Sequence, residues 1–167
     1  KGLPKLTMLL KLELLGLVIL ANAVPILLYD LLQERWAWPL DGGLCWRDGR
    51  RLLGPSATLR GLVAAVGVTA AVAVWLGHAP HIGLAIGFAA MLGDACSSFV
   101  KRRFGLAPGD MALGLDQIPE SLFPLLAVME PFRLSWGDVG LLVVGFMVFE
   151  LLISRLLYRL RLRKRPY

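Results

Sequence analysis

Long apolar stretches alternate with short charged ones along the whole chain. The apolar windows lie at residues 6–32, 59–77, 82–100, 115–131 and 137–158. A helix needs roughly 20 apolar residues to cross the hydrocarbon core of a bilayer, and apolar runs near this length are typical of spanning helices. The pattern therefore predicts an all-α, polytopic integral membrane protein with about five transmembrane helices, built as a single transmembrane domain over residues 1–167.

The fourth window differs from the others because prolines interrupt it at positions 119, 124 and 131. A helix over residues 116–131 would be only about 24 Å long at 1.5 Å per residue, which is shorter than the ~30 Å core of a bilayer. Either this helix begins earlier, near residue 111, or it begins inside the membrane beside a water-filled cavity, where irregular backbone is tolerated. We favour a polar cavity that is open to the cytoplasm.

The composition supports the membrane assignment. Apolar residues make up 57% of the 167 residues, the mean hydropathy is +0.67, and 18 basic against 12 acidic residues give a net charge of +6. An average soluble chain is less apolar and more charged, so a large extramembrane domain is excluded. Cys45 and Cys96 have no CxxC spacing and indicate neither a disulfide framework nor a cysteine metal site. In a membrane protein, basic residues mark cytoplasmic loops and contacts with anionic lipid, so we expect no nucleic-acid partner.

The basic residues predict the orientation of the chain. Fourteen of the 18 lie between residues 35 and 60, at residues 101–103, or between residues 155 and 165. Five alternating spans place these three segments on one side of the membrane, and the positive-inside rule makes that side cytoplasmic. We therefore expect a multi-pass protein of the cell membrane with its N-terminus outside and its site facing the cytoplasm. The first window is too long for a cleaved signal peptide and is expected to remain as a helix.

The end of the third window carries the strongest chemical signal. Asp94, Ser97, Ser98, Lys101 and Arg102 are spaced i, i+3, i+4, i+7 and i+8, which places them on one helical face. Lys101 lies about 10 Å along the axis from Asp94. If Lys101 marks the interface, Asp94 lies within the membrane, where a carboxylate is a functional-site hypothesis by default. The alternative is that Asp94 only pairs with an arginine of a neighbouring helix.

A second carboxylate, Asp116, opens the fourth window. Two carboxylates, Asp94 and Asp116, suit Mg²⁺, which binds one or two carboxylates together with phosphate oxygens and water. Glu120, one turn further on, is a candidate third metal ligand. The cations Lys101 and Arg102 beside them could hold a polyphosphate. A helix N-cap is the simpler role for Asp116, and the two roles are compatible.

The segment before the second window presents groups that could bind an anion. Backbone N–H groups and hydroxyls at a helix start attract anions, and arginines add positive charge. The candidate residues are Arg50, Arg51, Gly54, Ser56, Thr58 and Arg60, with Ser98 from the third window. The segment lacks the Gly-Lys-Ser/Thr ending of a Walker A loop. On its own it is also explained as a capped helix start in a basic loop.

Three other features have simpler explanations. His78 and His81 lie at the opposite end of the second window, where a metal site is not expected. Glu150 precedes Arg155 in the fifth window, and we expect an ion pair within or between helices. Tryptophans flank the windows as interface anchors do; they are Trp36, Trp38, Trp46 and Trp136.

These motifs, in this order, resemble the membrane CTP-dependent phosphatidate cytidylyltransferases, and most closely the compact branch of CDP-archaeol synthases. The matching segments are residues 21–25, 39–41, 48–54, 58–61, 93–94, 98–103 and 115–117. The resemblance implies a five-span helical fold with a cytoplasmic cavity, Mg²⁺ as cofactor, and transfer of a cytidylyl group from CTP to a lipid phosphate with release of pyrophosphate. It also implies that Asp94 and Asp116 bind metal, that Lys101 and Arg102 bind phosphates, and that residues 54–60 bind the nucleotide.

Two positions depart from the family pattern. Ala57 stands where the family commonly has Lys, and Pro119 stands where it commonly has a second acid. Arg50 or Arg51 could replace the missing cation, and Glu120 could replace the missing acid.

We predict a lipid-phosphate cytidylyltransferase. The carboxylates and cations described above permit this cytidylyl transfer even without the family resemblance. The alternative, suggested by Ala57 and Pro119, is a catalytically impaired relative that binds nucleotide or anionic lipid as a regulatory or assembly protein. A small transporter is less favoured because the polar residues cluster on one side of the membrane. The apolar windows accommodate acyl and isoprenoid lipids alike, and a homodimer is compatible with the sequence.

Overall fold

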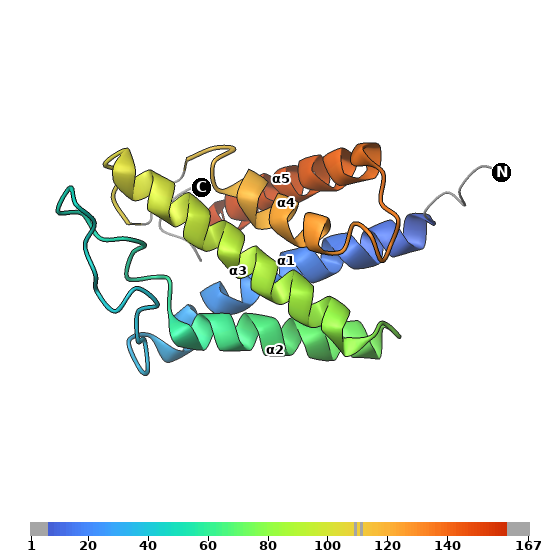
Figure 1. The fold of residues 1–167 in the computed structure, drawn as a ribbon, viewed down its shortest axis with the longest axis horizontal. Coiled ribbons are helices and arrows are strands. Elements are labelled where there is room, and N and C mark those ends of the chain that lie inside the picture. Colours follow the sequence, from blue (N-terminus) through green and yellow to red (C-terminus); the bar gives the residue numbers. More distant parts are fainter. Residues whose placement is uncertain (1–6, 109, 111, 160–167) are drawn as a thin grey trace.

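The described part of the chain folds into five helices, as the apolar windows predicted. The computed structural model describes residues 7–108, 110 and 112–159. The helices are α1 (Met8–Leu32), α2 (Leu59–Trp75), α3 (Pro80–Arg103), α4 (Gln117–Ala127) and α5 (Trp136–Arg159) (Figure 1). Within the described residues, pairing between extended segments is limited to two isolated bridges, both in the connector between α1 and α2. The predicted all-α fold class is confirmed.

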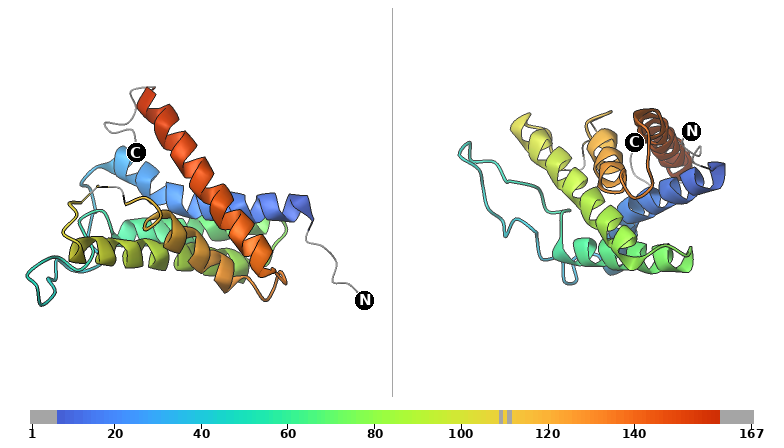
Figure 2. Two further views of the ribbon diagram at one scale, coloured as in Figure 1. Left: turned by 90° about the horizontal axis from the view of Figure 1, so that it is seen from above. Right: turned by 45° about the vertical axis from the view of Figure 1, so that its right-hand side comes forward.

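Consecutive helices run in opposite directions (Figure 1). One end of the molecule, which we call the basic end, therefore carries the α1–α2 connector (residues 33–58), the α3–α4 loop (residues 104–116) and the C-terminal end of α5. Figure 2 shows that α5 rises away from α2, α3 and the connector toward that end. This arrangement agrees with the alternating topology predicted from the basic residues. The basic residues at positions 1, 5, 161 and 163–165 lie outside the described residues.

The helices differ in whether they could cross a membrane. By length and composition, α1, α3 and residues Trp136–Leu156 of α5 are long and apolar enough, whereas Leu59–Trp75 is a shorter apolar helix of 17 residues. Helix α4 has only 11 residues and is about 17 Å long. It begins at Gln117, and no described residue near position 111 extends it. Of the two alternatives for the fourth window, the short helix is the one observed.

The core draws buried side chains from all five helices. Leu14 and Val18 of α1, Ile86 of α3 and Leu125 of α4 are almost fully buried. Equally apolar side chains cover the outer faces of the helices; examples are Leu12, Val63, Phe88, Leu141 and Val144. A helix that is apolar all round is typical of a membrane interior, where the outer face contacts lipid.

Two glycines of α3 let this helix approach α2 closely. A Cβ atom added at Gly83 would lie 2.5 Å from the Cα of Ala70, and one at Gly87 would lie 2.8 Å from the Cα of Val66. No side chain fits at these separations, so the GxxxG spacing marks a backbone-to-backbone contact, as such motifs do in membrane helices.

The connector is organised by Asp41. Its carboxylate accepts hydrogen bonds from the Gly43 N–H at 2.9 Å and the Leu53 N–H at 3.1 Å, and it pairs with Arg51 at 2.7 Å. Burial opposes ionisation of this carboxyl, but the hydrogen bonds outweigh burial and hold the pKa of Asp41 below its ordinary value. The connector is thus folded into a defined hairpin-like shape, with a bridge between Cys45 and Arg51.

Candidate active site

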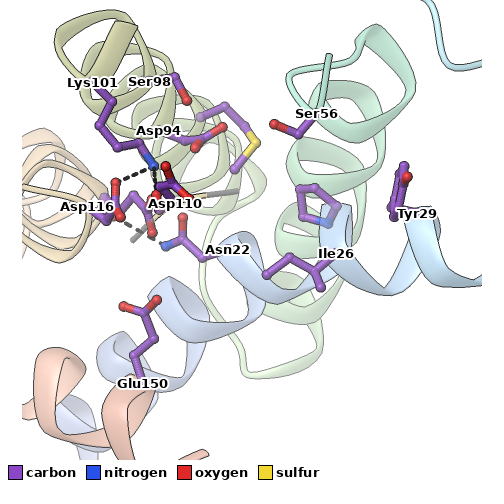
Figure 3. A pocket seen from close by; sticks show the side chains of 13 residues that line it. Asn22, Ile26, Tyr29, Ser56, Asp94, Ser98, Lys101, Asp110, Asp116 and Glu150 are labelled. Atoms are coloured by element: carbon purple, nitrogen blue, oxygen red, sulfur yellow. Dashed lines mark hydrogen bonds and ion pairs between the residues drawn. The ribbon is translucent and has the colours of Figure 1, made fainter. Parts of the chain in front are cut away.

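A polar cavity of about 290 Å³ lies toward the basic end, between α1, α3, α4 and α5 (Figure 3). Its lining residues are Asn22, Pro25, Ile26, Tyr29, Ser56, Met91, Asp94, Ser98, Lys101, Asp110, Asp116, Glu120 and Glu150. The cavity thus gathers side chains from four helices and from both segments that connect them at the basic end. Its occurrence fits the expectation of a polar cavity beside the short fourth helix.

Helix α3 supplies one wall of the cavity. Asp94, Ser98 and Lys101 follow one another at intervals of four and three residues and all line the same cavity, as their helical spacing predicted. The hydroxyl of Ser97 instead donates to the backbone carbonyl of Asp94 at 2.9 Å, so Ser97 is buried in the helix contact and does not line the cavity.

Lys101 is the cation of the cavity. Its Nζ lies 2.7 Å from Oδ1 of Asp116 and donates to the carbonyl oxygen of Asp110 at 3.3 Å. The side chains of Lys101 and Asp116 are 13% and 11% exposed. Because this ion pair is largely shielded from water, its electrostatic attraction is stronger than that of a surface pair.

Asp116 lies at the N-cap position of α4 but does not cap the helix. No side-chain hydrogen bond from Asp116 reaches the first turn of α4. Its Oδ2 instead accepts from the backbone N–H of Ala112 at 3.0 Å. The α3–α4 loop therefore orients the Asp116 carboxylate toward Lys101. The simpler N-cap role does not explain this orientation.

Asp94 faces the cavity from the middle of the α3 wall (Figure 3). Within the described residues, its carboxylate takes part in no hydrogen bond or ion pair, and Lys101 and Asp116 are charged neighbours. The alternative that Asp94 serves only to pair with an arginine of another helix thus finds no such partner among the described residues. A membrane carboxylate without that role is expected to bind a ligand.

The position of α4 depends on Gly93. A Cβ atom at this residue would lie 2.3 Å from the carbonyl oxygen of Pro119 and 2.8 Å from the amide nitrogen of Glu120. The backbones of α3 and α4 are therefore in direct contact one residue before Asp94. On the other side of α4, the side-chain amide of Asn22 donates to the carbonyl oxygen of Glu120 at 3.3 Å. These two contacts fix α4 and bring Glu120 into the cavity wall.

The donor set of the cavity is compatible with a hard divalent cation. Asp94, Asp116 and Glu120, the three predicted metal ligands, all line it. Within the part of the chain that the structure describes, no three His, Cys, Asp or Glu side chains are grouped closely enough to share one ion. Mg²⁺ does not require three protein ligands, since it takes one or two carboxylates and completes its shell with phosphate oxygens and water.

The predicted anion-binding residues divide into two groups. Ser56 and Ser98 line the cavity. Thr58 caps α2, because its Oγ1 accepts from the Gly61 N–H at 3.3 Å, and Arg60 donates to the carbonyl oxygens of Gln33 and Arg35. Gly54, like Thr58, is buried beside the connector rather than in the cavity wall.

Three arginines of the candidate site hold the basic end together. Arg102 is buried and donates to the carbonyl oxygen of Ala107 at 3.1 Å. Arg50 donates to the backbone at the end of α3, and Arg51 pairs with Asp41. None of the three lines the cavity, and the replacement of the missing cation by Arg50 or Arg51 stays a prediction. Ala57 itself is 5% exposed.

The cavity includes polar residues that sequence reasoning did not select. Asn22 and Tyr29 of α1, Asp110 of the α3–α4 loop and Glu150 of α5 all line it. The ion pair expected for Glu150 stays a prediction, and Figure 3 shows its carboxylate directed toward the cavity. Glu150, like Asp94, is a carboxylate inside an apolar window, which is a functional-site signal in the sequence.

The fold and the cavity together describe an integral membrane protein with a polar cavity between its helices. Comparison with known proteins identifies the family. The model of the CarS-like CDP-archaeol synthase family matches residues 21–167. The CDP-archaeol synthase of Thermococcus onnurineus is 36% identical over 74% of this chain and 76% of its own length, and that of Pyrococcus furiosus is 31% identical over 88% and 90%.

A solved structure described as an intramembrane enzyme for archaeal membrane lipid biosynthesis also matches. It has a TM-score of 0.75 and 28% identity, with 89% of this chain and 94% of the other covered. The chain belongs to the CDP-archaeol synthase family. The predicted resemblance, the all-helical membrane fold and the activity of a lipid-phosphate cytidylyltransferase are confirmed, and the alternative of an impaired relative is not favoured.

Proposed function

We propose that the chain transfers a cytidylyl group from CTP to an archaeol-type lipid phosphate, and that the cavity around Asp94, Lys101 and Asp116 is where this happens. The supporting observation is the placement of two carboxylates and a shielded lysine in one polar cavity between apolar helices. The lipid class is proposed from the relatives, which are CDP-archaeol synthases.

The reaction exchanges one phosphoanhydride bond for another. An oxygen of the lipid phosphate attacks the α-phosphorus of CTP and forms the new P–O bond, while the bond from the α-phosphorus to the bridging oxygen of the β-phosphate breaks and pyrophosphate leaves. The attacking phosphate is already anionic near neutral pH, so no general base is needed. Catalysis then rests on positioning and on neutralising negative charge.

Lys101 is the residue proposed to neutralise that charge. In the present structure its ammonium group is paired with Asp116 at 2.7 Å. A phosphate in the cavity would offer Lys101 a second anionic partner. We infer that Lys101 turns from Asp116 to the phosphates when substrates bind, which places its charge where the transition state is most negative.

Asp94 and Asp116 are the residues proposed to hold Mg²⁺; Glu120, the third predicted ligand, lines the same cavity but is not grouped closely enough with both to share the ion. When bound, the ion would neutralise and orient phosphate oxygens. Ser56 and Ser98, which also line the cavity, are proposed to donate hydrogen bonds to the nucleotide. Thr58 and Arg60 support this wall indirectly, by capping α2 and by fastening the start of the connector.

The cavity is proposed to face the cytoplasm of a cell-membrane protein. CTP is a soluble, cytoplasmic nucleotide, and the cavity lies toward the basic end, which the positive-inside rule assigns to the cytoplasm. A homodimer stays a prediction, because no feature of the cavity indicates a second copy of the chain.

The proposal is tested with the purified full-length protein in detergent, α-labelled CTP, Mg²⁺, and either archaeol phosphate or phosphatidate. We expect labelled lipid and pyrophosphate in equal amounts, with archaeol phosphate the better acceptor. Asp94→Asn should lower the rate by about 10²-fold or more, on the scale of a lost electrostatic group in a catalytic site. Asp138→Asn removes a carboxylate in the first turn of α5, at the end of that helix away from the basic end, and should retain activity. Absence of CDP-lipid with both acceptors, while a relative is active in the same assay, would refute the proposal.

A further inference from the structure

The α1–α2 connector runs across the basic end of the molecule, transverse to the helix axes (Figure 1). It is fastened to the last turn of α3. Arg50 donates to the carbonyl oxygens of Arg102 and Arg103 at 3.1 and 3.0 Å, and Arg103 donates to the carbonyl oxygen of Arg51 at 2.6 Å. The ring of Trp46 meets that of Phe99 edge-on, with 5.6 Å between centroids. The connector therefore has a fixed depth, level with residues 99–103.

That depth corresponds to the membrane–water interface. Helix α3 has 24 residues and is about 36 Å long, whereas the hydrocarbon core of a bilayer is ~30 Å thick. The last turn of α3, which carries Lys101, Arg102 and Arg103, extends beyond the core into the headgroup region. The connector, joined to this turn, lies there too.

The connector exposes large apolar side chains at this level. Trp36 is 71% exposed, Trp38 67%, Leu44 63% and Trp46 48%. Tryptophan is favoured at the headgroup level because its ring is apolar while its N–H remains hydrated. A connector surrounded only by water would leave this apolar area without a partner.

The charges of the connector favour an anionic partner. Its three acidic residues each have a partner within the chain: Asp41 pairs with Arg51, Asp48 pairs with Arg103, and Glu34 accepts from the hydroxyl of Tyr29. In contrast, Arg35 and Arg47 are exposed, and within the described residues their guanidinium groups make no hydrogen bond or ion pair. The positive charge that remains is directed outward.

We propose that the connector is a lipid-binding surface that holds anionic phospholipid headgroups of the surrounding bilayer beside the cavity. Ser56, near the end of the connector, lines the cavity, so this surface is continuous with the candidate active site. The consequence for catalysis, which rests on the proposed function, is that lipid phosphates collect next to the cavity before they enter it.

Cys45, exposed in the connector, provides a probe that does not depend on activity. An environment-sensitive fluorophore is attached to Cys45 in the full-length Cys96→Ala protein, which is placed in phosphatidylcholine nanodiscs with or without phosphatidylglycerol. We expect a blue-shifted, brighter emission when the anionic lipid is present. The double variant R35Q/R47Q should lose this response, whereas R133Q, which removes an exposed arginine between α4 and α5, should keep it.

The catalytic consequence is measured separately. R35Q/R47Q should raise the apparent KM for lipid phosphate by about five-fold per arginine, which is the contribution of one basic residue at an anionic surface, with the KM for CTP unchanged. An emission that is the same in both nanodiscs, or a double variant that responds like the parent protein, overturns the proposal. A fluorescence response in a protein that forms no CDP-lipid would leave the lipid surface intact and refute the proposed function alone.

Discussion

Replacing Gly93 by Ala tests how strictly the α3–α4 contact defines the cavity. The added Cβ would lie 2.3 Å from the carbonyl oxygen of Pro119 and 2.8 Å from the backbone nitrogen of Glu120. Both neighbours are backbone atoms, so no side-chain rotation relieves the clash. Ordinary contact begins near 3.4 Å, and α4 must therefore withdraw from α3 by roughly 1 Å.

The cost follows from two opposing effects. Overpacking of a tight contact destabilises a protein by about 1–3 kcal/mol, and the gain in helix propensity from Gly to Ala offsets at most about 1 kcal/mol of this. A shift of α4 by about 1 Å also moves Asp116 and Glu120 away from Asp94, and a misplacement of this size can lower a rate by about 10²-fold. We expect a modest loss of stability and a large loss of activity.

Two other glycines make the experiment specific. Gly87→Ala creates a similar backbone clash, at 2.8 Å from the Cα of Val66, but against α2 and away from the cavity. It should lower the melting temperature and leave most of the activity in the folded protein. Gly16→Ala adds a Cβ with nothing within 4 Å inside α1; it should leave activity unchanged and should not lower the melting temperature, because Ala favours the helix over Gly.

Thermal unfolding in detergent and the rate of CDP-lipid formation check these variants. A loss of 1 kcal/mol lowers the melting temperature by about 2–4 °C for a chain of this size. A G93A protein with the parent's melting temperature and rate would refute the contact between α3 and α4. Equal losses of activity in G93A and G87A would show that general destabilisation explains the effect.

Three further outcomes follow from the structure. Asp41→Ala should loosen the connector by about 2–3 kcal/mol, because it removes three hydrogen bonds. In the parent protein, the pKa of Asp41 is lowered, so this stabilisation is complete above pH ~4 and is lost as the pH falls through the folded-state pKa. The rate at which a protease cleaves the connector, measured at decreasing pH in the parent and the variant, checks both the loss of stability and its pH dependence. Lys101→Met should abolish CDP-lipid formation, and Lys101→Arg should restore only part of it, because a planar guanidinium does not replace a compact ammonium group; rates in the detergent assay decide this. Ala57→Lys should lower the KM for CTP, because it adds a cation to the proposed nucleotide-binding segment; an unchanged KM in a folded protein would show that position 57 does not contact the nucleotide.

The helical part of the fold was predictable because each helix is an apolar run of its own. The window at 59–77 and α2 at Leu59–Trp75 nearly coincide. For α4, the sequence predicted only a helix too short to cross the membrane, and not its exact bounds. Helix α4 ends at Ala127, before the predicted window 115–131 does.

The candidate site was predictable where its residues share one helix. Asp94, Ser98 and Lys101 are related by helical spacing, so the sequence alone places them on one face. Asn22 and Glu150 enter the cavity from α1 and α5, and their approach depends on how five helices pack. The connector arginines were assigned to the anion site by charge alone, whereas Arg50 and Arg51 in fact hold the connector to α3 and to Asp41.

The central claim is that a metal ion and the phosphates of CTP bind between Asp94, Asp116 and Lys101. The most direct test is a crystal structure of the full-length protein with CTP and Mn²⁺, which reports the metal through its anomalous scattering. We predict a Mn²⁺ peak within coordination distance of the Asp94 and Asp116 carboxylates, with the phosphates of CTP in contact with Lys101. If the nucleotide and the metal bind elsewhere and this cavity holds water alone, the proposed binding site is wrong.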